Sequence, residues 1–574
     1  MKARRALENG RGGIRGSMWD RLVARRVEFG ILGIAALSIL LRCAHLFTSR
    51  NYYILSPDSY FFHWAAQGVM AGKPPLVPPD TGVPYALHSG MVYPLAYMAE
   101  GISSATGMSS AQTLELVSKS LPPFLGLLTL VVVWLVAARL WNRRAALFAA
   151  LAWAIMFHCV FIGASGYLDR DGISSLLLLA GAVLFLVSDR WHIRVRGRNI
   201  GWLVAGILVL VVEVLLYLEW GIVGALLLLS IVVSYVAVRF VLELAYRDKR
   251  EREAGSGARA ALQQVGWRAL TIVILGNVVL AAAWHGVVSA SLSSLLEYVL
   301  HGGQSAVSEL QGLGLTDLLV YQLFVVPIAV GLYVAFKNRN GGALLFSCWF
   351  LCFLVLALFA RRVLFYATVP AALLSGIGLA VLWDWARLGQ GQTQRKVGVA
   401  LLLCLIVLIS VAMVPSLSSS PIVAVDEEWQ QALQYIKEDT PEGSVVMTVW
   451  SWGYWILDLG DRRPVVDNGY YGSPPDKLHD VGVAYATTQP SEAAQMMERN
   501  SADYLIYSTL DLQHAATILG WVEPGDKRSE FPDDSMVVRC LDGRFESGGG
   551  LEVVYRTEPD SEVVVLHLVS GATQ

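Results

Sequence analysis

Long apolar segments dominate the first 420 residues of the chain. A helix that crosses a membrane needs about 20 apolar residues, because each residue rises about 1.5 Å through a hydrocarbon layer about 30 Å thick. The sequence therefore predicts a polytopic α-helical membrane protein. We count eleven such segments, and a re-entrant or extra helix would raise the count to thirteen: 28–47, 121–141, 145–164, 173–189, 201–218, 221–243, 269–290, 317–336, 342–360, 364–384 and 397–415.

Basic residues predict the orientation of these segments. Eight Lys/Arg precede residue 28, and further Lys/Arg fall in every second loop after it. Loops rich in Lys/Arg stay cytoplasmic. Segment 28–47 is too long for a cleaved signal peptide and is expected to be an anchor. We therefore expect a multi-pass protein of the cell (inner) membrane, with a cytoplasmic N-terminus and a periplasmic or extracellular C-terminal domain. The loops expected on the outer side are 48–120, 165–172, 291–316 and 361–363.

Residues 421–574 have a different composition. They hold 26 Asp/Glu and 10 Lys/Arg, a net charge of −16, whereas residues 1–420 carry +14. We expect two domains: a transmembrane catalytic domain over 1–420 and an extracytoplasmic domain over 421–574. The second is predicted to be a soluble mixed α/β domain, with helices near 427–438 and 491–499 and short strands at 445–450, 464–466, 504–507, 536–538, 553–555 and 563–568. No pattern in the chain indicates nucleic-acid binding.

Two carboxylates one residue apart lie in a short outward turn. Asp169 and Asp171 stand between two apolar segments. Alternate acidic residues on an extended turn can direct oxygens at a common centre, which suits a hard divalent cation such as Mg²⁺ or Mn²⁺. Both could instead cap the helix that follows, because the first turn of a helix favours negative charge.

Other charged residues lie in the outward loops. Asp58 follows the first segment and is either a metal ligand or a helix N-cap. Glu309 lies between glycines, so it belongs either to a mobile lid over a site or to a solvated surface. Arg361 and Arg362 could bind a lipid pyrophosphate or extend to the headgroups.

An aromatic cluster opens the acidic domain. Trp450, Ser451, Trp452, Gly453 and Tyr454 follow a β-type run. Such a cluster offers apolar area together with N–H and O–H donors, as a binding wall does. A belt of aromatic side chains resting on the membrane is the alternative.

Taken in order along the chain, these motifs resemble the catalytic subunit of oligosaccharyltransferase. The resemblance rests on Asp58, the Asp169-x-Asp171 pair, Val307-Ser308-Glu309, Arg361-Arg362 and the aromatic cluster at the head of an outward domain. It implies a single-subunit, prokaryotic-type enzyme with a GT-C-like fold.

The resemblance also implies an activity. Such enzymes move an oligosaccharide from a polyprenyl-pyrophosphate carrier to asparagine side chains in Asn-x-Ser/Thr sequons of an acceptor polypeptide, at the lipid bilayer. We expect a monomer that uses Mn²⁺ or Mg²⁺. By resemblance, the metal ligands are Asp58, Asp169, Asp171 and Glu309; the catalytic residues are Asp58 and Glu309; Arg361 and Arg362 bind the donor pyrophosphate; and Trp450, Ser451, Trp452, Gly453 and Tyr454 bind the acceptor.

The chain departs from the family in the Trp-Trp-Asp-Tyr-Gly motif. Val449, Trp450 and Ser451 occupy the places of the two Trp and the Asp, and Trp452 occupies that of the Tyr. A hydroxyl cannot replace a carboxylate as a charge-assisted acceptor. The family's second acceptor-contacting motif has only Ile518 as a candidate. Two alternatives therefore stay open: a membrane glycosyltransferase with a polyprenyl-linked donor and a different acceptor, and a non-catalytic relative of the fold.

Overall fold

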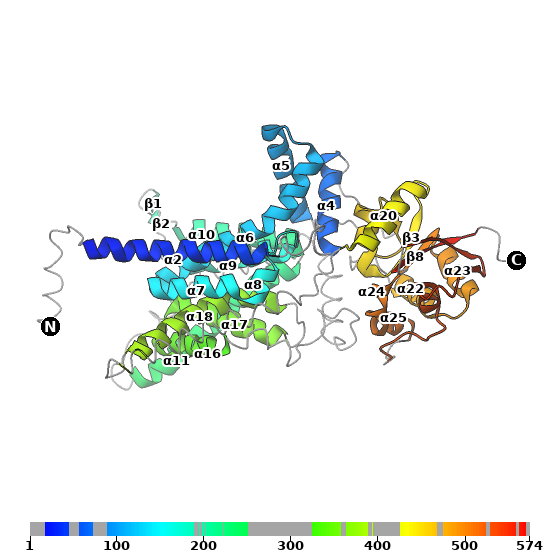
Figure 1. Cartoon of the computed structure of the whole chain (residues 1–574). Coiled ribbons are helices and arrows are strands. Elements are labelled where there is room, and N and C mark those ends of the chain that lie inside the picture. Colours follow the sequence, from blue (N-terminus) through cyan, green and yellow to red (C-terminus); the bar gives the residue numbers. More distant parts are fainter. Residues whose placement is uncertain are drawn as a thin grey trace, which may run out of the picture.

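The computed structural model of the chain describes residues 18–44, 57–72, 89–188, 194–195, 198–199, 201–220, 222–250, 324–357, 363–387, 425–467, 475–523, 528–557 and 562–569, with Thr393 and Lys396. In Figure 1, apolar helices occupy one side of the molecule and a mixed α/β domain occupies the other.

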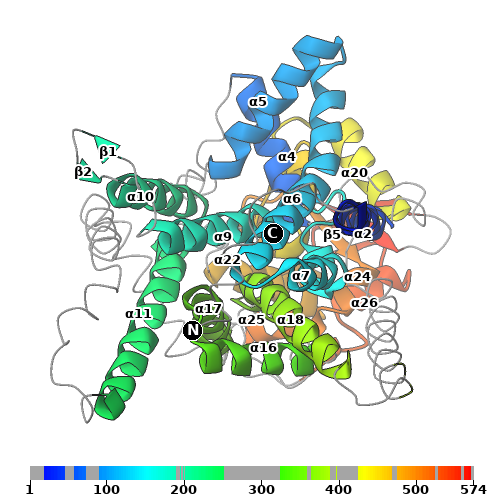
Figure 2. The same cartoon turned by 90° about the vertical axis from the view of Figure 1, so that its left-hand side faces the viewer.

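A bundle of apolar helices forms the first part of the molecule. In Figure 2, α11 and α2 lie on opposite sides of this bundle, with α7 and α18 between them. The bundle helices are α2 (Met18–Arg42), α6 (Ser110–Leu140), α7 (Arg143–Ile155), α8 (Phe157–Phe161), α9 (Arg170–Ser188), α10 (Gly201–Trp220), α11 (Ile222–Arg250), α16 (Val325–Asn338), α17 (Gly341–Ala357) and α18 (Leu364–Arg387).

Nine of the eleven predicted segments coincide with helices of this bundle, and 269–290 and 397–415 lie outside the described residues. Three described helices are long and apolar enough to cross a membrane, namely Ser110–Leu140, Arg170–Val187 and Leu364–Arg387, and further apolar helices are 10–17 residues long. The predicted segment 145–164 is interrupted. Met156 is extended (φ −65°, ψ 127°), so the segment divides into α7 and α8.

Helix α18 lies at the centre of the bundle and packs against α7, α16 and α17. Gly376 permits the close approach to α7, since a Cβ at this position would lie 2.5 Å from the backbone oxygen of Ala145. Small residues at helix contacts allow backbones to come together inside membranes. The N-terminal end of α18 is therefore held firmly beside α8 and α9, which it also contacts.

Helix α4 (Pro57–Met70) lies between the bundle and the α/β domain, and α5 (Ser89–Thr106) stands above the bundle, packed against α4 and α6 (Figure 1). Both come from the predicted outward loop 48–120. That loop also contains the first turns of α6, which begins at Ser110 rather than near residue 121. On the opposite part of the bundle, the described residues include a hairpin of β1 (Arg194–Val195) and β2 (Arg198–Asn199), which the sequence did not predict.

The α/β domain contains a six-stranded mixed sheet of order β4-β3-β5-β8-β7-β6. The strands β3, β4 and β5 are parallel, whereas β5, β8, β7 and β6 pair antiparallel. The strand bounds are β3 (Val445–Met447), β4 (Arg463–Pro464), β5 (Tyr504–Ser508), β6 (Ser547–Gly548), β7 (Leu551–Arg556) and β8 (Val563–Leu568).

Helices and one short 3-10 turn pack around this sheet. They are α20 (Glu427–Asp439), η5 (Trp450–Trp452), α21 (Gly453–Asp458), α22 (Pro475–Ala486), α23 (Pro490–Arg499), α24 (Thr509–Leu512), α25 (Ala515–Val522) and α26 (Met536–Leu541). The predicted helices over 427–438 and 491–499 are confirmed as α20 and α23.

The strand predicted at 536–538 is wrong, because these residues begin the helix α26. Met536, Val537 and Cys540 are buried, and spacings of one and four residues put them on one helix face. A run of three apolar residues has no period that separates a strand from a helix. Two valines favoured the strand by propensity, and the packing of α26 against β5 and β8 overrides that preference.

Candidate functional site

Asp58 lies in the first turn of α4, where its negative charge suits the helix N-terminus. Its side chain is half-buried. The rest of α4 connects the bundle to the α/β domain, since it contacts α6 on one side and α21 on the other. The position of Asp58 therefore depends on both parts of the molecule.

The contact between α4 and α21 is aromatic with one polar pair. Phe61 and Tyr454 have ring centroids 5.1 Å apart, and Tyr60 lies edge-on to Trp455 at 6.4 Å. His63 Nδ1 is 3.0 Å from both carboxylate oxygens of Asp458, which is almost fully buried. Burial raises the pKa of the Asp458 carboxyl, and the contact with His63 opposes that shift.

The predicted pair of carboxylates is buried at the start of α9. Asp169 is 5% exposed and Asp171 1%. Asp169 Oδ1 accepts from the backbone N–H of Arg170 at 2.6 Å, and the Tyr167 hydroxyl lies 3.4 Å from its Oδ2. Asp171 Oδ1 accepts from the hydroxyl of Tyr366 on α18 at 2.5 Å. Asp169 thus contacts the start of α9, as expected if it caps that helix. Each of the two carboxylates also accepts a hydrogen bond from a tyrosine hydroxyl.

Residues 162–171, which we name the acidic loop, are fixed by neighbouring helices. Ser165 N–H donates to the backbone oxygen of Arg42 at 2.8 Å, and its hydroxyl donates to that of Lys119 at 2.9 Å. Gly166 has a φ of +79°, a conformation that L side chains rarely adopt. The loop is therefore held by the end of α2 and by α6, and it carries the two aspartates at its C-terminal end.

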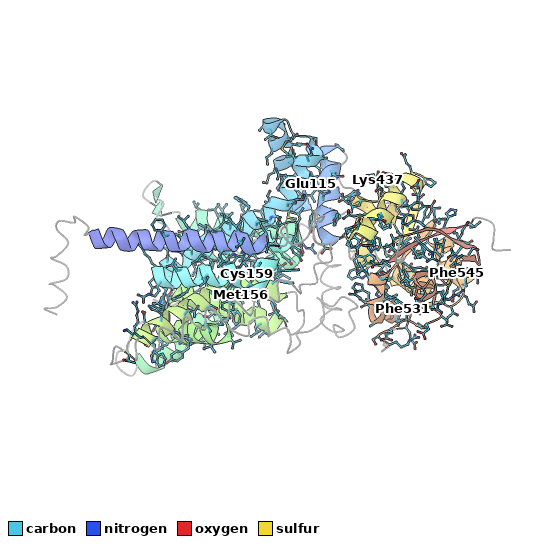
Figure 3. All side chains as sticks on the ribbon, in the orientation of Figure 1. Glu115, Met156, Cys159, Lys437, Phe531 and Phe545 are labelled. Atoms are coloured by element: carbon cyan, nitrogen blue, oxygen red, sulfur yellow. The ribbon has the colours of Figure 1, made fainter. Side chains whose placement is uncertain are left out.

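A buried arginine that the sequence analysis did not single out lies beneath this loop. The Arg42 guanidinium donates to Ser38 Oγ at 2.5 Å and to the backbone oxygen of Cys159 at 2.8 Å. Gly163 leaves room for it, since a Cβ there would lie 2.6 Å from Arg42 Nε. Figure 3 places Cys159 and Met156 inside the bundle. The helices on the two sides of the α7–α8 break thus provide carbonyl acceptors for the guanidinium charge.

The residues predicted to bind the acceptor, 450–454, which we name the Trp turn, are divided by burial. Trp450 and Ser451 are half-buried, whereas Trp452 is 1% and Tyr454 4% exposed. Gly453 is needed for close packing, since a Cβ there would lie 2.6 Å from Asp467 Cα. Trp450 and Ser451 are therefore the members of the turn that reach the surface, and the other three lie in the core.

The buried carboxylate of Asp511 holds the Trp452 side chain by a hydrogen bond. Its Oδ1 accepts from the indole N–H at 2.6 Å, and its Oδ2 accepts from Ser508 N–H at 2.7 Å. Burial raises the pKa of Asp511 to about 7, although these donors oppose the shift. His514 lies across the Trp452 ring at 5.7 Å between centroids, and burial lowers its pKa.

Sequence reasoning missed Asp511 and His514. Ile518, the candidate for a second acceptor-contacting motif, is fully buried in the core, whereas Asp511 and His514 contact the Trp turn. The sequence signal that could have indicated Asp511 is its position as a carboxylate shortly after the apolar strand β5. Polar groups at the carboxyl end of a central strand often serve a site.

One hydrophobic cluster unites the predicted motifs. It contains Phe61 beside Asp58, Leu168 beside Asp169, and Trp452 and Tyr454 of the Trp turn. These segments are more than 100 residues apart in sequence, yet they pack where the bundle meets the α/β domain.

The structure does not gather all the predicted metal ligands. Among the described residues, Asp58, Asp169 and Asp171 do not form a group with oxygens within 4.8 Å of one another, and the one acidic group that meets this distance is Asp426, Glu428 and Glu562 on the α/β domain. The predicted residues Glu309, Arg361 and Arg362 lie outside the described residues. The donor chemistry nevertheless fits a hard cation, because Asp169 and Asp171 are buried carboxylates and only oxygens are offered.

Comparison with known proteins identifies relatives. No family model matches the chain. Dolichyl-phosphooligosaccharide-protein glycotransferase 2 of Pyrococcus furiosus is 30% identical over 179 residues, 31% of this chain and 21% of that protein. Glycotransferase 1 of the same organism is 28% identical over 154 residues, 24% of this chain and 15% of that protein. The chain is thus similar to these two glycotransferases over limited stretches, which span about a fifth of their own length or less.

The chain has a GT-C-like fold. The oligosaccharyltransferase of Archaeoglobus fulgidus in its apo form aligns with a TM-score of 0.71 at 14% identity, over 93% of this chain and 80% of that one. ArnT from Cupriavidus metallidurans aligns at 0.52 and 12% identity, over 96% and 99%. These identities show the fold alone. The A. fulgidus protein has also been solved with an inhibitory peptide and a dolichol-phosphate, and with Zn and sulfate.

Proposed function

We propose that the chain transfers an oligosaccharide from a polyprenyl-pyrophosphate carrier to asparagine side chains of exported polypeptides. The observation that carries this proposal is the convergence at one junction of α4 with Asp58, the acidic loop and the Trp turn. Each segment alone has a structural explanation. A shared position at the membrane face suits a reaction that joins a lipid-borne donor to a soluble acceptor.

In this proposal the carboxylates hold Mn²⁺ or Mg²⁺, with Asp58, Asp169, Asp171 and Glu309 as the ligands. A bound cation would neutralise the charge that develops on the leaving pyrophosphate. Asp169 and Asp171 support this assignment by their burial, because ionised carboxylates are costly to bury unless charges or donors compensate them. The A. fulgidus structure with Zn is consistent with a metal in this fold.

The chain's own residues would prepare the acceptor. Asp58 and Glu309 would accept N–H bonds from the asparagine amide, which weakens the conjugation that makes an amide nitrogen a poor nucleophile. Arg361 and Arg362 would bind the pyrophosphate through charge-assisted hydrogen bonds. Trp450 and Ser451 would contact the acceptor, and Trp452, Gly453 and Tyr454 would support them from the core.

The α4–α21 contact would couple the two substrate sites. Asp58 lies in the first turn of the helix whose His63, Phe61 and Tyr60 contact α21. Helix α21 begins at Gly453, within the Trp turn. A shift of the Trp turn would therefore move the helix that carries Asp58. This coupling matters because the acceptor amide must meet both regions at once.

We also propose the domain arrangement and topology stated from the sequence: a transmembrane domain over 1–420, an exported domain over 421–574, a cytoplasmic N-terminus, a location in the cell membrane, and a monomer. The charge pattern of the loops supports this orientation. A reporter that is active only in the cytoplasm, fused to the C-terminus, should be silent. Strong activity of that fusion would contradict the topology.

The activity itself is tested with purified full-length protein in detergent. We would incubate it with lipid-linked oligosaccharide, Mn²⁺ and Asn-containing peptides with and without Thr at the +2 position, and detect glycopeptide by mass. Glycopeptide from the Thr peptide supports the proposal. Consumption of the donor with a hydroxyl or lipid acceptor, and with no peptide product, would favour the alternative acceptor instead.

A further inference from the structure

Tyr366 and Asp171 form a buried pair between distant parts of the chain. The Tyr366 hydroxyl donates to Asp171 Oδ1 at 2.5 Å, and the two residues are 195 positions apart. Tyr366 is 3% exposed and Asp171 1%. A hydrogen bond from a hydroxyl to an ionised carboxylate is short and is stronger than a bond between neutral groups. At this depth such a bond fixes the rotation of the carboxylate.

The tyrosine is itself held rigidly. It lies in the first turn of α18, which packs against α7, α8 and α9. The neighbouring Phe365 ring stacks on Phe161 at 6.3 Å and 14°, and Phe161 lies 4.4 Å from the Tyr167 ring of the acidic loop. The start of α18 and the acidic loop therefore form one packed unit.

The two carboxylates of the loop differ in the source of their hydroxyl contact. Asp169 is approached by Tyr167 of its own loop at 3.4 Å, whereas Asp171 receives a shorter bond from another helix. Of these two hydroxyl contacts, the bond from Tyr366 to Asp171 is the one that connects the acidic loop to α18. Helix α18 begins shortly after Arg361 and Arg362.

We propose that Tyr366 is a positioning residue that orients the Asp171 carboxylate for a divalent cation and keeps it in register with the start of α18. This inference rests on the proposed function, because it takes Asp171 as a metal ligand. Residues that hydrogen-bond a metal ligand typically change metal affinity by about 10- to 100-fold when they are removed. Tyr366 would act through Asp171 and would not touch the substrate.

The test uses Tyr366→Phe in the full-length protein, which removes one oxygen and keeps the ring. Mn²⁺ binding is measured directly, from the loss of the free-ion EPR signal. We expect Mn²⁺ to bind about tenfold more weakly. Transfer activity should show the same shift in the Mn²⁺ concentration for half-maximal rate and recover at saturating Mn²⁺.

The matched control is Tyr235→Phe, which removes a hydroxyl from the same bundle. That hydroxyl accepts from Arg239 at 2.6 Å and touches no predicted ligand, so Mn²⁺ binding should stay unchanged. Tyr366→His keeps a ring N–H donor, and its affinity should lie between those of the natural chain and Tyr366→Phe. It also serves as the test variant if Tyr366→Phe does not fold.

The variant Asp171→Asn distinguishes failure of the Tyr366 proposal from failure of the proposed metal site. If Tyr366 acts through Asp171, Tyr366→Phe should have no further effect on Mn²⁺ binding in the Asp171→Asn background. Should Mn²⁺ bind the natural chain and weaken in Asp171→Asn but not in Tyr366→Phe, this inference is overturned and the metal site stands. Absence of Mn²⁺ binding to the natural chain would overturn both.

Discussion

The acidic loop and the Trp turn differ in which of their residues are buried. In the acidic loop the groups suited to chemistry, Asp169 and Asp171, are the buried ones. In the Trp turn the buried members, Trp452 and Tyr454, support the half-buried Trp450 and Ser451. A change to a buried residue should therefore reduce activity in the loop and stability in the turn.

The largest expected effect comes from Asp171→Asn. This substitution keeps the volume but removes the charge, so we expect glycopeptide formation to fall by roughly a hundred- to a thousandfold. The rate at saturating donor and peptide is the measurement. Asp384→Asn is the control, because Asp384 is an exposed carboxylate of α18 that pairs with Arg144. An unchanged rate in Asp171→Asn would remove the acidic loop from the reaction.

The free energy of unfolding of the α/β domain should depend on pH through Asp511, which contacts the Trp turn. Asp511 binds its proton more tightly in the folded chain, with a pKa of about 7, than in the unfolded chain, where about 4 is usual. Its contribution to the free energy of unfolding is therefore fully present below pH about 4 and is lost as the pH rises through about 7, by at most about 4 kcal/mol.

The measurement is the urea concentration at which the α/β domain becomes susceptible to protease, at pH 5.5 and pH 8. Asp511→Asn should flatten the difference between the two pH values. Asp503→Asn is the control in the same domain, since Asp503 also accepts a backbone N–H, from Val445. An equal slope in Asp511→Asn and in the natural chain would assign the pH dependence to other groups.

Trp452→Phe and Trp450→Phe test the division within the turn. Loss of the Trp452 indole removes the N–H that donates to Oδ1 of the buried Asp511 carboxylate, which should cost about 2–3 kcal/mol of unfolding free energy. Trp450→Phe should cost less than about 1 kcal/mol, because its side chain is partly solvated. It should instead raise the KM for the peptide. Equal destabilisation by the two changes would contradict the division.

The smallest effect is expected from Ser451→Asp. A charged acceptor of a buried hydroxyl proton contributes about 1.5–3 kcal/mol, and a neutral acceptor about 0.5–1.5 kcal/mol. The difference of about 1 kcal/mol is a several-fold change in affinity. Selectivity for Thr over Ala at +2 should therefore sharpen in Ser451→Asp. Strict dependence on Thr in the natural chain would mean that another residue, such as the nearby His514, contacts the hydroxyl.

The sequence predicted those parts of the fold that depend on local patterns. Apolar length is a local property, so the helices of the bundle could be found without tertiary information. The helix α20 was predicted because Trp429, Leu433 and Ile436 recur at helical spacing, and all three are buried. The strand at 536–538 failed because three residues are too few to show a period.

The contacts that organise the site could not be predicted in this way. Tyr366 meets Asp171 across 195 residues, and Asp511 meets Trp452 across 59. The spacing within neither pair indicates a contact, although the position of Asp511 after an apolar strand marks it as a candidate site residue. Trp450 and Trp452 are chemically identical, and only the position of α21 against α4 and the sheet decides which of them faces the surface.

Arg42 has a consequence for how the protein is made. When α2 first enters the membrane, the chain that contains Cys159 and Trp153 has not yet been synthesised, so the guanidinium lacks the carbonyl partners that it has in the finished fold. A charged side chain at membrane depth is costly unless it reaches water or protein acceptors. We expect α2 to insert at first with Arg42 extended to the outer surface, and to settle inward only after α6, α7 and α8 arrive. Chains truncated before residue 150 should therefore leave the neighbouring Cys43 reactive to a membrane-impermeant maleimide, whereas in full-length chains it should react more slowly.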